Sequence, residues 1–233
     1  MKRFIFVACA AALAFLATSC YQSVVTPLGD DLASFTKRVD KTTELVGVKN
    51  TLNNAVVVEP IYEVVHYKYG FIVAAKDNHF AVYDNIGIRY FEDLDIISAE
   101  AGKKEMYFLF KTNKGKYFYL PHRELCGPAN DFTYYPGLFL LFAQNAGGNY
   151  GVYDPNSGEV VLQQKYRSIV YAYTENDQSA FYVSDGKTTK KVSNGGERLI
   201  AASNLSIMKK EARTNKTLWP KEGVGVVKVK TLR

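Results

Sequence analysis

The sequence predicts an all-β fold built from repeated antiparallel hairpins, and three observations support this. From about residue 45 onward, short runs rich in Val, Ile, Tyr and Phe alternate with clusters of Asn, Asp, Gly and Lys. Apolar runs bounded by turn-forming residues are typical of strands and hairpins. Similar runs also recur along the chain, and helical patterns are confined to 31–43 and to the region near 205–213.

The repeats are clearest in three five-residue segments, 46–50, 80–84 and 150–154. Each segment holds an apolar residue, a small residue, an apolar residue, a spacer and a turn former. Weaker copies start at 117 and 190, so the starts at 46, 80, 117, 150 and 190 lie 34, 37, 33 and 40 residues apart. Such a period indicates a repeated supersecondary unit. Because a lone hairpin is marginal in water, we expect the units to stack in an incomplete propeller-like or solenoid-like arrangement.

Two copies carry a further pattern. Tyr150-Gly151 begins one apolar run, and Val46-Gly47 begins another that leads to Pro60-Ile61-Tyr62. These repeats resemble the tryptophan-glycine (WG) repeats of secreted bacterial proteins, in which an aromatic-glycine pair starts a strand and a later strand ends in a Pro-x-Tyr-like element. The resemblance covers about 45–200, and the defining Trp is absent from each copy because the single Trp is Trp219. It implies an interaction scaffold without shared catalytic residues.

One repeat illustrates the expected hairpins. The runs 71–75, 79–83 and 88–91 predict three strands. The segments between them hold Asn, Asp and Gly, which suit the positive φ angles of tight turns. Tyr62 and Tyr166 each end one apolar run and precede another. We therefore expect both rings to be buried against the neighbouring repeat.

The first twenty residues have the pattern of a secretion signal. Lys2 and Arg3 precede the uncharged stretch 4–17, which is about fourteen residues long and shorter than the roughly twenty needed to span a bilayer core. The segment 17–20 reads Ala-Thr-Ser-Cys and resembles a lipobox. This resemblance implies cleavage before Cys20 and lipid on its thiol. An ordinary secretion signal with an incidental cysteine is the alternative.

These patterns divide the chain into a signal peptide (1–19), a lipidated tether with a short helix (20–44) and a β-repeat domain with a basic C-terminal strand and tail (45–233). The helix is expected over 31–43, because Leu32, Phe35 and Val39 share one helical face. We expect the lipid to hold the protein in the outer membrane, facing the periplasm. The residues after Cys20 carry neither the Asp of an inner-membrane retention signal nor the acidic run of a surface-export signal.

Charge and cysteine content limit the classes of function. Without Lys2 and Arg3 there are 27 basic residues against 23 acidic ones, a net charge of +4. This mild charge and the expected export disfavour nucleic-acid binding. The segment 208–233 carries eight basic residues and two glutamates, which suits either anionic head groups or, as we favour, a solvated strand and terminus. Beyond Cys20 the one remaining cysteine is Cys126, so the core must stabilise the fold without an internal disulfide.

Two groups of residues could carry catalysis. His122 and Cys126 lie four residues apart, and an imidazole beside a thiol can form a nucleophilic pair. An inert, buried cysteine is the alternative that we favour. An acidic cluster could instead hydrolyse glycosides, although turn positions also explain it; it comprises Asp84, Glu92, Asp93 and Asp95. His66 and His79 have no metal-ligand spacing, and we expect neither metal nor cofactor.

The aromatic stretch 132–139 offers a candidate binding surface through Tyr134, Tyr135 and Phe139, because exposed aromatic rings stack on sugars or dock proteins. Burial of alternating aromatics is the competing explanation, and it is the one that we favour. The function we expect is a membrane-anchored, non-enzymatic binding or scaffold lipoprotein of the bacterial envelope, whose partner is an envelope protein or a glycan. The alternatives are a hydrolase that acts on envelope polymers and a purely structural envelope subunit.

Overall fold

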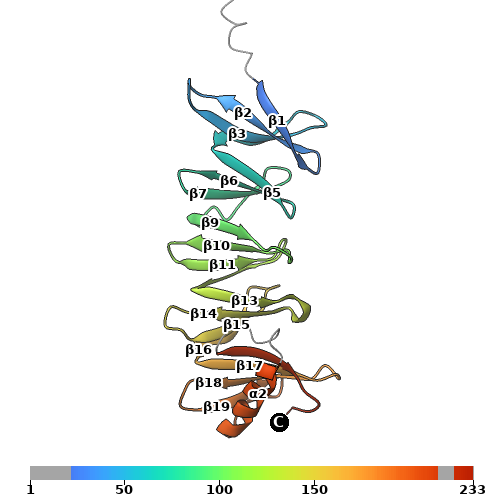
Figure 1. Ribbon diagram of the computed structural model, residues 1–233, viewed down its shortest axis with the longest axis vertical. Helices are drawn as coiled ribbons and strands as arrows, with labels where there is room; N and C mark the ends of the chain where they lie inside the picture. Colours follow the sequence, from blue (N-terminus) through green and yellow to red (C-terminus); the bar gives the residue numbers. More distant parts are fainter. Residues whose placement is uncertain (1–21, 215–222, 233) are drawn as a thin grey trace, which may run out of the picture. The chain divides into compact units, whose positions relative to one another are not determined.

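The fold is all-β and is built of antiparallel hairpins, as the sequence predicts (Figure 1). The computed structural model describes residues 22–214 and 223–232. The chain divides into two compact units, Met1–Ser98 and Ala99–Arg233. Sheets that follow one another along the chain are antiparallel meanders, apart from one parallel pair in the last sheet, and two of them have four strands each, like the blades of a propeller.

The N-terminal unit contains two meanders. The first has the strand order β1 (Gln22–Gly29), β2 (Leu32–Arg38), β3 (Glu44–Asn50) and β4 (Val56–Tyr62). The second contains β5 (Val64–Lys68), β6 (Phe71–Lys76), β7 (His79–Asp84) and β8 (Arg89–Tyr90). Phe80 of β7 also pairs with Ile96 of β9 (Ile96–Ala101), the strand in which one unit ends and the next begins. A buried cluster that includes Leu32, Val48 and Ile72 joins the two meanders.

The C-terminal unit continues the same pattern and closes with a helix. Its strands are β10 (Phe108–Thr112), β11 (Gly115–Tyr119) and β12 (Leu125–Ala129), then β13 (Asp131–Tyr135), the 3₁₀ turn η1 (Pro136–Leu138), β14 (Leu140–Gln144), β15 (Tyr150–Tyr153) and β16 (Val160–Tyr166). The last sheet holds β17 (Ser168–Tyr173), β18 (Ser179–Ser184), β19 (Thr189–Ser193) and β20 (Gly196–Leu199). After α2 (Ala202–Thr214), β21 (Val224–Lys228) returns to pair in parallel with β17.

The tether and helix predicted before residue 45 are wrong where the structure describes them. Residues 22–29 form β1, and Leu32–Arg38 form β2, which pairs with β1 on one side and β3 on the other. Asp30 and Asp31 have φ angles of 46° and 59° and make the hairpin turn, so they do not begin a helix. The helical spacing of three apolar residues is a weak signal that strand pairing on both sides overrides. The β-rich part of the chain therefore begins well before residue 45.

Other elements agree with the sequence. The strands expected at 71–75, 79–83 and 88–91 are β6, β7 and the short β8. Asp77 and Asn78 have φ angles of 51° and 61°, as the two central residues of a type I′ hairpin require. The helical region near 205–213 lies within α2.

Two repeat copies share the same irregular register. Between β3 and β4 the opposed pairs are Val46–Tyr62, Val48–Val58 and Lys49–Val56. Between β15 and β16 they are Tyr150–Tyr166, Val152–Leu162 and Tyr153–Val160. Every residue of the second set lies 104 positions after its counterpart, since 150 − 46 = 104 and 166 − 62 = 104. Both sets therefore place the same bulges in the second strand, which bend that strand over the first.

The two tyrosines of these registers occupy the core, as expected. Tyr62 is 9% exposed and Tyr166 is 4% exposed. The Tyr62 ring meets that of Tyr83 edge to face, with 6.1 Å between centroids, and Tyr83 lies on β7 in the next sheet. In the copy that starts at residue 80, Phe80 faces Ile96, so an aliphatic side chain takes the place of the tyrosine.

The glycine of each motif lies where the bulged strand comes closest. A Cβ on Gly47 would stand 2.6 Å from the Val58 carbonyl oxygen and 2.8 Å from the Pro60 nitrogen. At Gly151 the corresponding distances are 2.5 Å to the Leu162 oxygen and 2.8 Å to the Gln164 nitrogen. These obstacles are backbone atoms and cannot rotate away. The aromatic-glycine or apolar-glycine pair therefore reflects a steric requirement for glycine in both copies.

We predict that Gly47→Ala and Gly151→Ala each destabilise the fold by a similar amount, about 1–3 kcal/mol, because the added methyl group must displace the bulged strand. Urea denaturation of the two variants measures this. Gly137→Ala is the matched control, since a Cβ there meets nothing within 4 Å and should change stability little. Equal midpoints for Gly47→Ala and Gly137→Ala would contradict the packing argument.

Candidate functional site

The three aromatic residues proposed as a binding surface do not share one surface. Neighbouring residues of a strand point to opposite faces, and this separates Tyr134 from Tyr135 on β13. Tyr135 is 9% exposed, and its ring meets Phe142 in the core at a centroid distance of 5.7 Å. Burial raises the pKa of Tyr135. The expectation that Tyr135 lies on an exposed binding surface is therefore wrong.

The other two aromatics have different surroundings. Tyr134 is half-buried and packs against Phe118, with 4.9 Å between ring centroids, and against Tyr107 at 6.1 Å. Phe139 is 58% exposed and has a φ angle of 46° at the end of η1. Of the three residues only Phe139 presents a largely open ring, so the aromatic density of 132–139 is mainly core packing.

Cys126 has the environment of an inert thiol. Its side chain is fully buried, and its sulfur lies 3.7 Å from the Asp154 carbonyl oxygen. Burial, and secondly the charge of Asp154, raise the pKa of the Cys126 thiol to about 12. A nucleophilic cysteine needs the opposite shift. His122 is exposed in the β11–β12 loop, where its backbone N–H donates to the Tyr119 hydroxyl at 3.2 Å.

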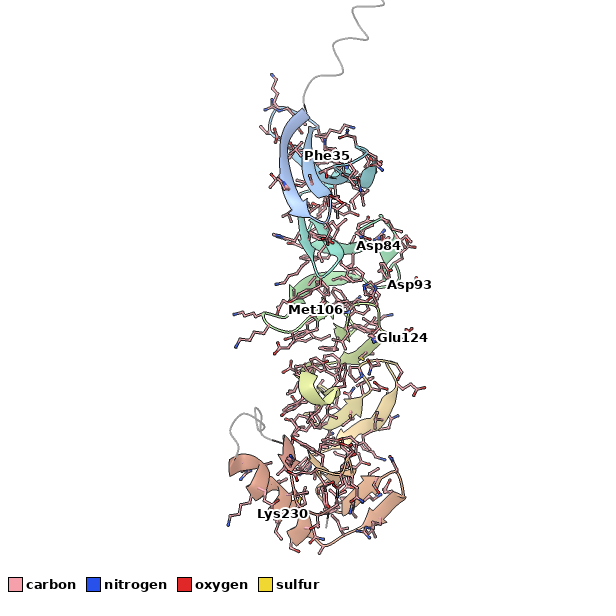
Figure 2. The ribbon with its side chains drawn as sticks, turned by 90° about the vertical axis from the view of Figure 1, so that its right-hand side faces the viewer. Phe35, Asp84, Asp93, Met106, Glu124 and Lys230 are labelled. Carbon is pink, nitrogen blue, oxygen red and sulfur yellow. The ribbon has the colours of Figure 1, made fainter. Side chains whose placement is uncertain are left out.

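The acidic residues of the predicted cluster hold turns and a surface pair. Asp84 Oδ1 accepts hydrogen bonds from the backbone N–H groups of Ile86 and Ile88, at 3.0 and 2.8 Å. Asp95 Oδ1 lies 2.7 Å from His79 Nδ1, and both side chains are exposed. Asp93 is also exposed, and Figure 2 labels it near Asp84 along one edge of the N-terminal unit. Asp84 thus caps a turn, and Asp95 belongs to an ion pair that needs protonated His79.

The turn that Asp84 caps recurs in other copies. Asn50 Oδ1 accepts from Leu52 N–H at 2.9 Å, and Asp154 Oδ1 accepts from Asn156 N–H at 2.8 Å. These acceptors stand 34 residues before and 70 residues after Asp84. Asx side chains that bond to the backbone two residues later stabilise turns. The turn former at the end of each clear repeat motif therefore has one structural role in all three copies.

Each of the two later turns rests on a strand of the preceding sheet in its own unit. In the N-terminal unit, a Cβ on Gly87 would lie 2.5 Å from the Val57 carbonyl oxygen of β4. In the C-terminal unit, a Cβ on Gly158 would lie 3.0 Å from the Leu125 carbonyl oxygen of β12, and the Glu124 N–H donates to the Asn156 carbonyl oxygen at 3.3 Å. Both glycines have positive φ angles, 94° and 71°. The turns are thereby held in place.

The turn 84–88 presents an apolar surface that the sequence analysis missed. Ile86 is 72% exposed and Ile88 56% exposed, and they flank the glycine that contacts β4. We call Ile86 and Ile88 the apolar corner. Two isoleucines in a turn otherwise made of Asp, Asn and Gly were the available sequence signal, since turns are normally polar.

The described residues contain neither a metal-binding cluster nor a membrane-spanning helix. Among residues 22–214 and 223–232, no group of three or more His, Cys, Asp or Glu side chains is arranged to hold a metal ion. No helix in that part of the chain has the length and apolarity needed to cross a membrane. Cys20 and Trp219 lie outside the described residues.

Comparison with known proteins gives weak structural similarity. No family model matches this chain, and no curated protein matches its sequence. Among solved structures, apo AztD from Citrobacter koseri has a TM-score of 0.33 and 11% identity over 76% of this chain and 58% of that chain. Hsv2 from Kluyveromyces lactis has a TM-score of 0.29 and 13% identity over 74% and 61%. BamB from Moraxella catarrhalis has a TM-score of 0.26 and 12% identity over 76% and 62%. The chain spans less than two thirds of each of the three.

We predict that Cys126 in the folded protein resists thiol reagents and reacts rapidly once the chain is unfolded. The fold binds the thiol proton more tightly than the unfolded chain, in which the pKa is near 9.0. The stability that this adds is present below pH 9.0 and is lost as the pH rises towards about 12. The difference in labelling between wild type and Cys126→Ala, followed against urea concentration, measures the reactivity. Rapid labelling in the absence of urea would contradict the burial argument.

Proposed function

We propose that this protein is a membrane-anchored, non-enzymatic binding module of the bacterial envelope, whose partner is another protein. The observation that carries the proposal is the apolar corner. There a capped turn is fixed against β4 and holds the side chains of Ile86 and Ile88 in solvent. Exposed apolar groups on a rigid sheet edge are a common feature of protein interaction sites.

The chemistry of the corner favours a protein over a glycan. Sugar rings are bound by flat aromatic faces and by polar groups, whereas Ile86 and Ile88 offer branched aliphatic groups alone. Aliphatic side chains gain from removal of water by an apolar partner surface. Because the turn is held by Asp84 and by the contact of Gly87 with Val57, little conformational entropy is lost when a partner docks.

The repeat architecture supports the same role. Asn50, Asp84 and Asp154 are all used as turn caps, and Tyr62 and Tyr166 as core residues. These polar and aromatic residues of the repeat therefore have structural roles. Recognition of a partner then falls to the loops between the strands. The lipobox-like segment that ends at Cys20 supports the anchoring half of the proposal, and the residues that follow it favour the periplasmic face of the outer membrane.

We predict that Ile86→Ser combined with Ile88→Ser abolishes partner capture without destabilising the fold. Both side chains are exposed, so stability should change by less than about 0.5 kcal/mol. The backbone N–H groups that bond to Asp84 remain in this variant. A photo-crosslinking amino acid at position 85, an exposed residue of the same turn, reports the contact in intact cells, with and without the double substitution.

Leu199→Ser is the control for that experiment, since Leu199 is 71% exposed on β20 and lies outside the corner. It should leave the crosslink at position 85 intact. If the double serine variant keeps the crosslinked product, or if Leu199→Ser loses it equally, the corner is not the docking surface.

We also predict that Cys20→Ala releases the protein from membranes and abolishes metabolic labelling by a palmitate analogue, because the acylated thiol is removed. Cys9→Ala, within the expected signal peptide, should retain both the label and the membrane association. Equal labelling of wild type and Cys20→Ala would show that Cys20 is not the acylation site.

A further inference from the structure

Helix α2 has one face in the core and one basic face. Leu205, Met208 and Ala212 are 5%, 1% and 0% exposed and pack in a cluster with residues of β17, β18 and β21. Ser206, Lys209, Lys210 and Arg213 line a shallow hollow on another side of the helix. Their spacing of three, one and three residues places them on one stripe of an α-helix. The stripe thus presents three cations beside one hydroxyl. Below, the basic face means Lys209, Lys210 and Arg213.

The charge around this helix is strongly one-sided. The described residues 202–214 and 223–232 contain five basic residues and one acidic residue, so their net charge is 5 − 1 = +4. The acidic residue, Glu211, lines a separate hollow with Met208, Lys228 and Lys230. Figure 2 marks Lys230 close to the helix. On β21, Lys228 forms an ion pair with Glu175 at 3.1 Å. The basic face therefore adds positive charge to an already positive part of the unit.

We infer that the basic face of α2 binds the anionic head groups of a phospholipid bilayer. Residues 209 and 213 are one helical turn apart, about 6 Å along the axis, so their side chains can meet a flat surface together. The apolar residues of α2 are held in the protein core, and the helix cannot insert into the bilayer as a free amphipathic helix does. Binding is then electrostatic, depends on vesicle charge and is weakened by salt.

The proposed lipid anchor favours a lipid surface over a soluble polyanion as the binding partner of the basic face. This step rests on the proposed function, since lipid on Cys20 would keep a bilayer within reach of the protein. Near an anionic membrane each Lys or Arg strengthens binding by about fivefold, which corresponds to about 1 kcal/mol per residue. The three cations together would strengthen the contact by roughly a hundredfold.

The test measures how strongly a bilayer protects individual lysines from chemical labelling. It uses the full-length protein, purified from bacterial membranes. The protein is reconstituted into vesicles of phosphatidylcholine alone, or of phosphatidylcholine with an equal amount of phosphatidylglycerol. A water-soluble amine reagent is added, and labelling of each lysine is followed by mass spectrometry. Lys209 and Lys210 report the basic face, and the exposed Lys103 and Lys104 serve as controls in the same sample. The ratio between the two vesicle types cancels any difference in local folding.

The expected result is that phosphatidylglycerol slows labelling of Lys209 and Lys210 severalfold, leaves Lys103 and Lys104 unchanged, and loses its effect in 1 M salt, where the Debye length is about 3 Å. Arg213→Gln keeps both reporter lysines and should weaken the contact by about fivefold. Arg198→Gln, which removes one exposed cation from β20, should leave the protection unchanged.

Three results would overturn the inference. They are equal labelling of Lys209 and Lys210 in the two vesicle types, equal protection of all four lysines, and protection by soluble heparin where phosphatidylglycerol has no effect. Flotation of the protein with the vesicles of phosphatidylcholine alone tests the lipid anchor separately. Protein that fails to float with them contradicts acylation at Cys20, while protection by phosphatidylglycerol still reports on α2.

Discussion

The close approach of two backbone segments at Gly47 and Gly151 is the constraint on which the repeat architecture depends. In each copy a bulged strand bends over its neighbour until its backbone stands where a Cβ would be. The bulge also brings Tyr62 or Tyr166 opposite the start of the motif, in the buried interior. A single glycine therefore couples strand register, strand curvature and the position of the main core aromatic.

The turn that follows each repeat motif presents outward-facing side chains on this framework. Asn50, Asp84 and Asp154 accept backbone hydrogen bonds at the same place in the repeat, and two of these turns rest through a glycine on the preceding sheet. Such a turn is defined by its own hydrogen bonds, so its outward side chains are free to vary. In the turn 84–88 they are isoleucines, and the same geometry that closes a hairpin exposes aliphatic groups to solvent.

Burial determines the chemistry of the side chains that the sequence suggested as functional. Cys126 lies inside the hydrophobic cluster of β11, β12, β14 and β15, where desolvation opposes formation of a thiolate. Tyr135 is likewise core. Most charged residues, by contrast, lie outside the core, and Lys191 is a buried exception. Helix α2 packs its apolar residues Leu205, Met208 and Ala212 against the last sheet, and its basic residues lie on another side of the helix.

The sequence by itself determined the all-β class, the hairpins around Asp77-Asn78, the burial of Tyr62 and Tyr166 and the helix near 205–213, because each follows from local pattern and turn chemistry. Tertiary structure decided the rest. The segment 32–38 is a strand because pairing on both sides outweighs a weak helical spacing. Tyr134 and Tyr135 differ in burial because the sheet has a core side, which no run of aromatic letters reveals. The apolar corner arises where Gly87 meets Val57, thirty residues earlier in the chain. The local sequence does not reveal this contact, because it forms between segments that are distant along the chain.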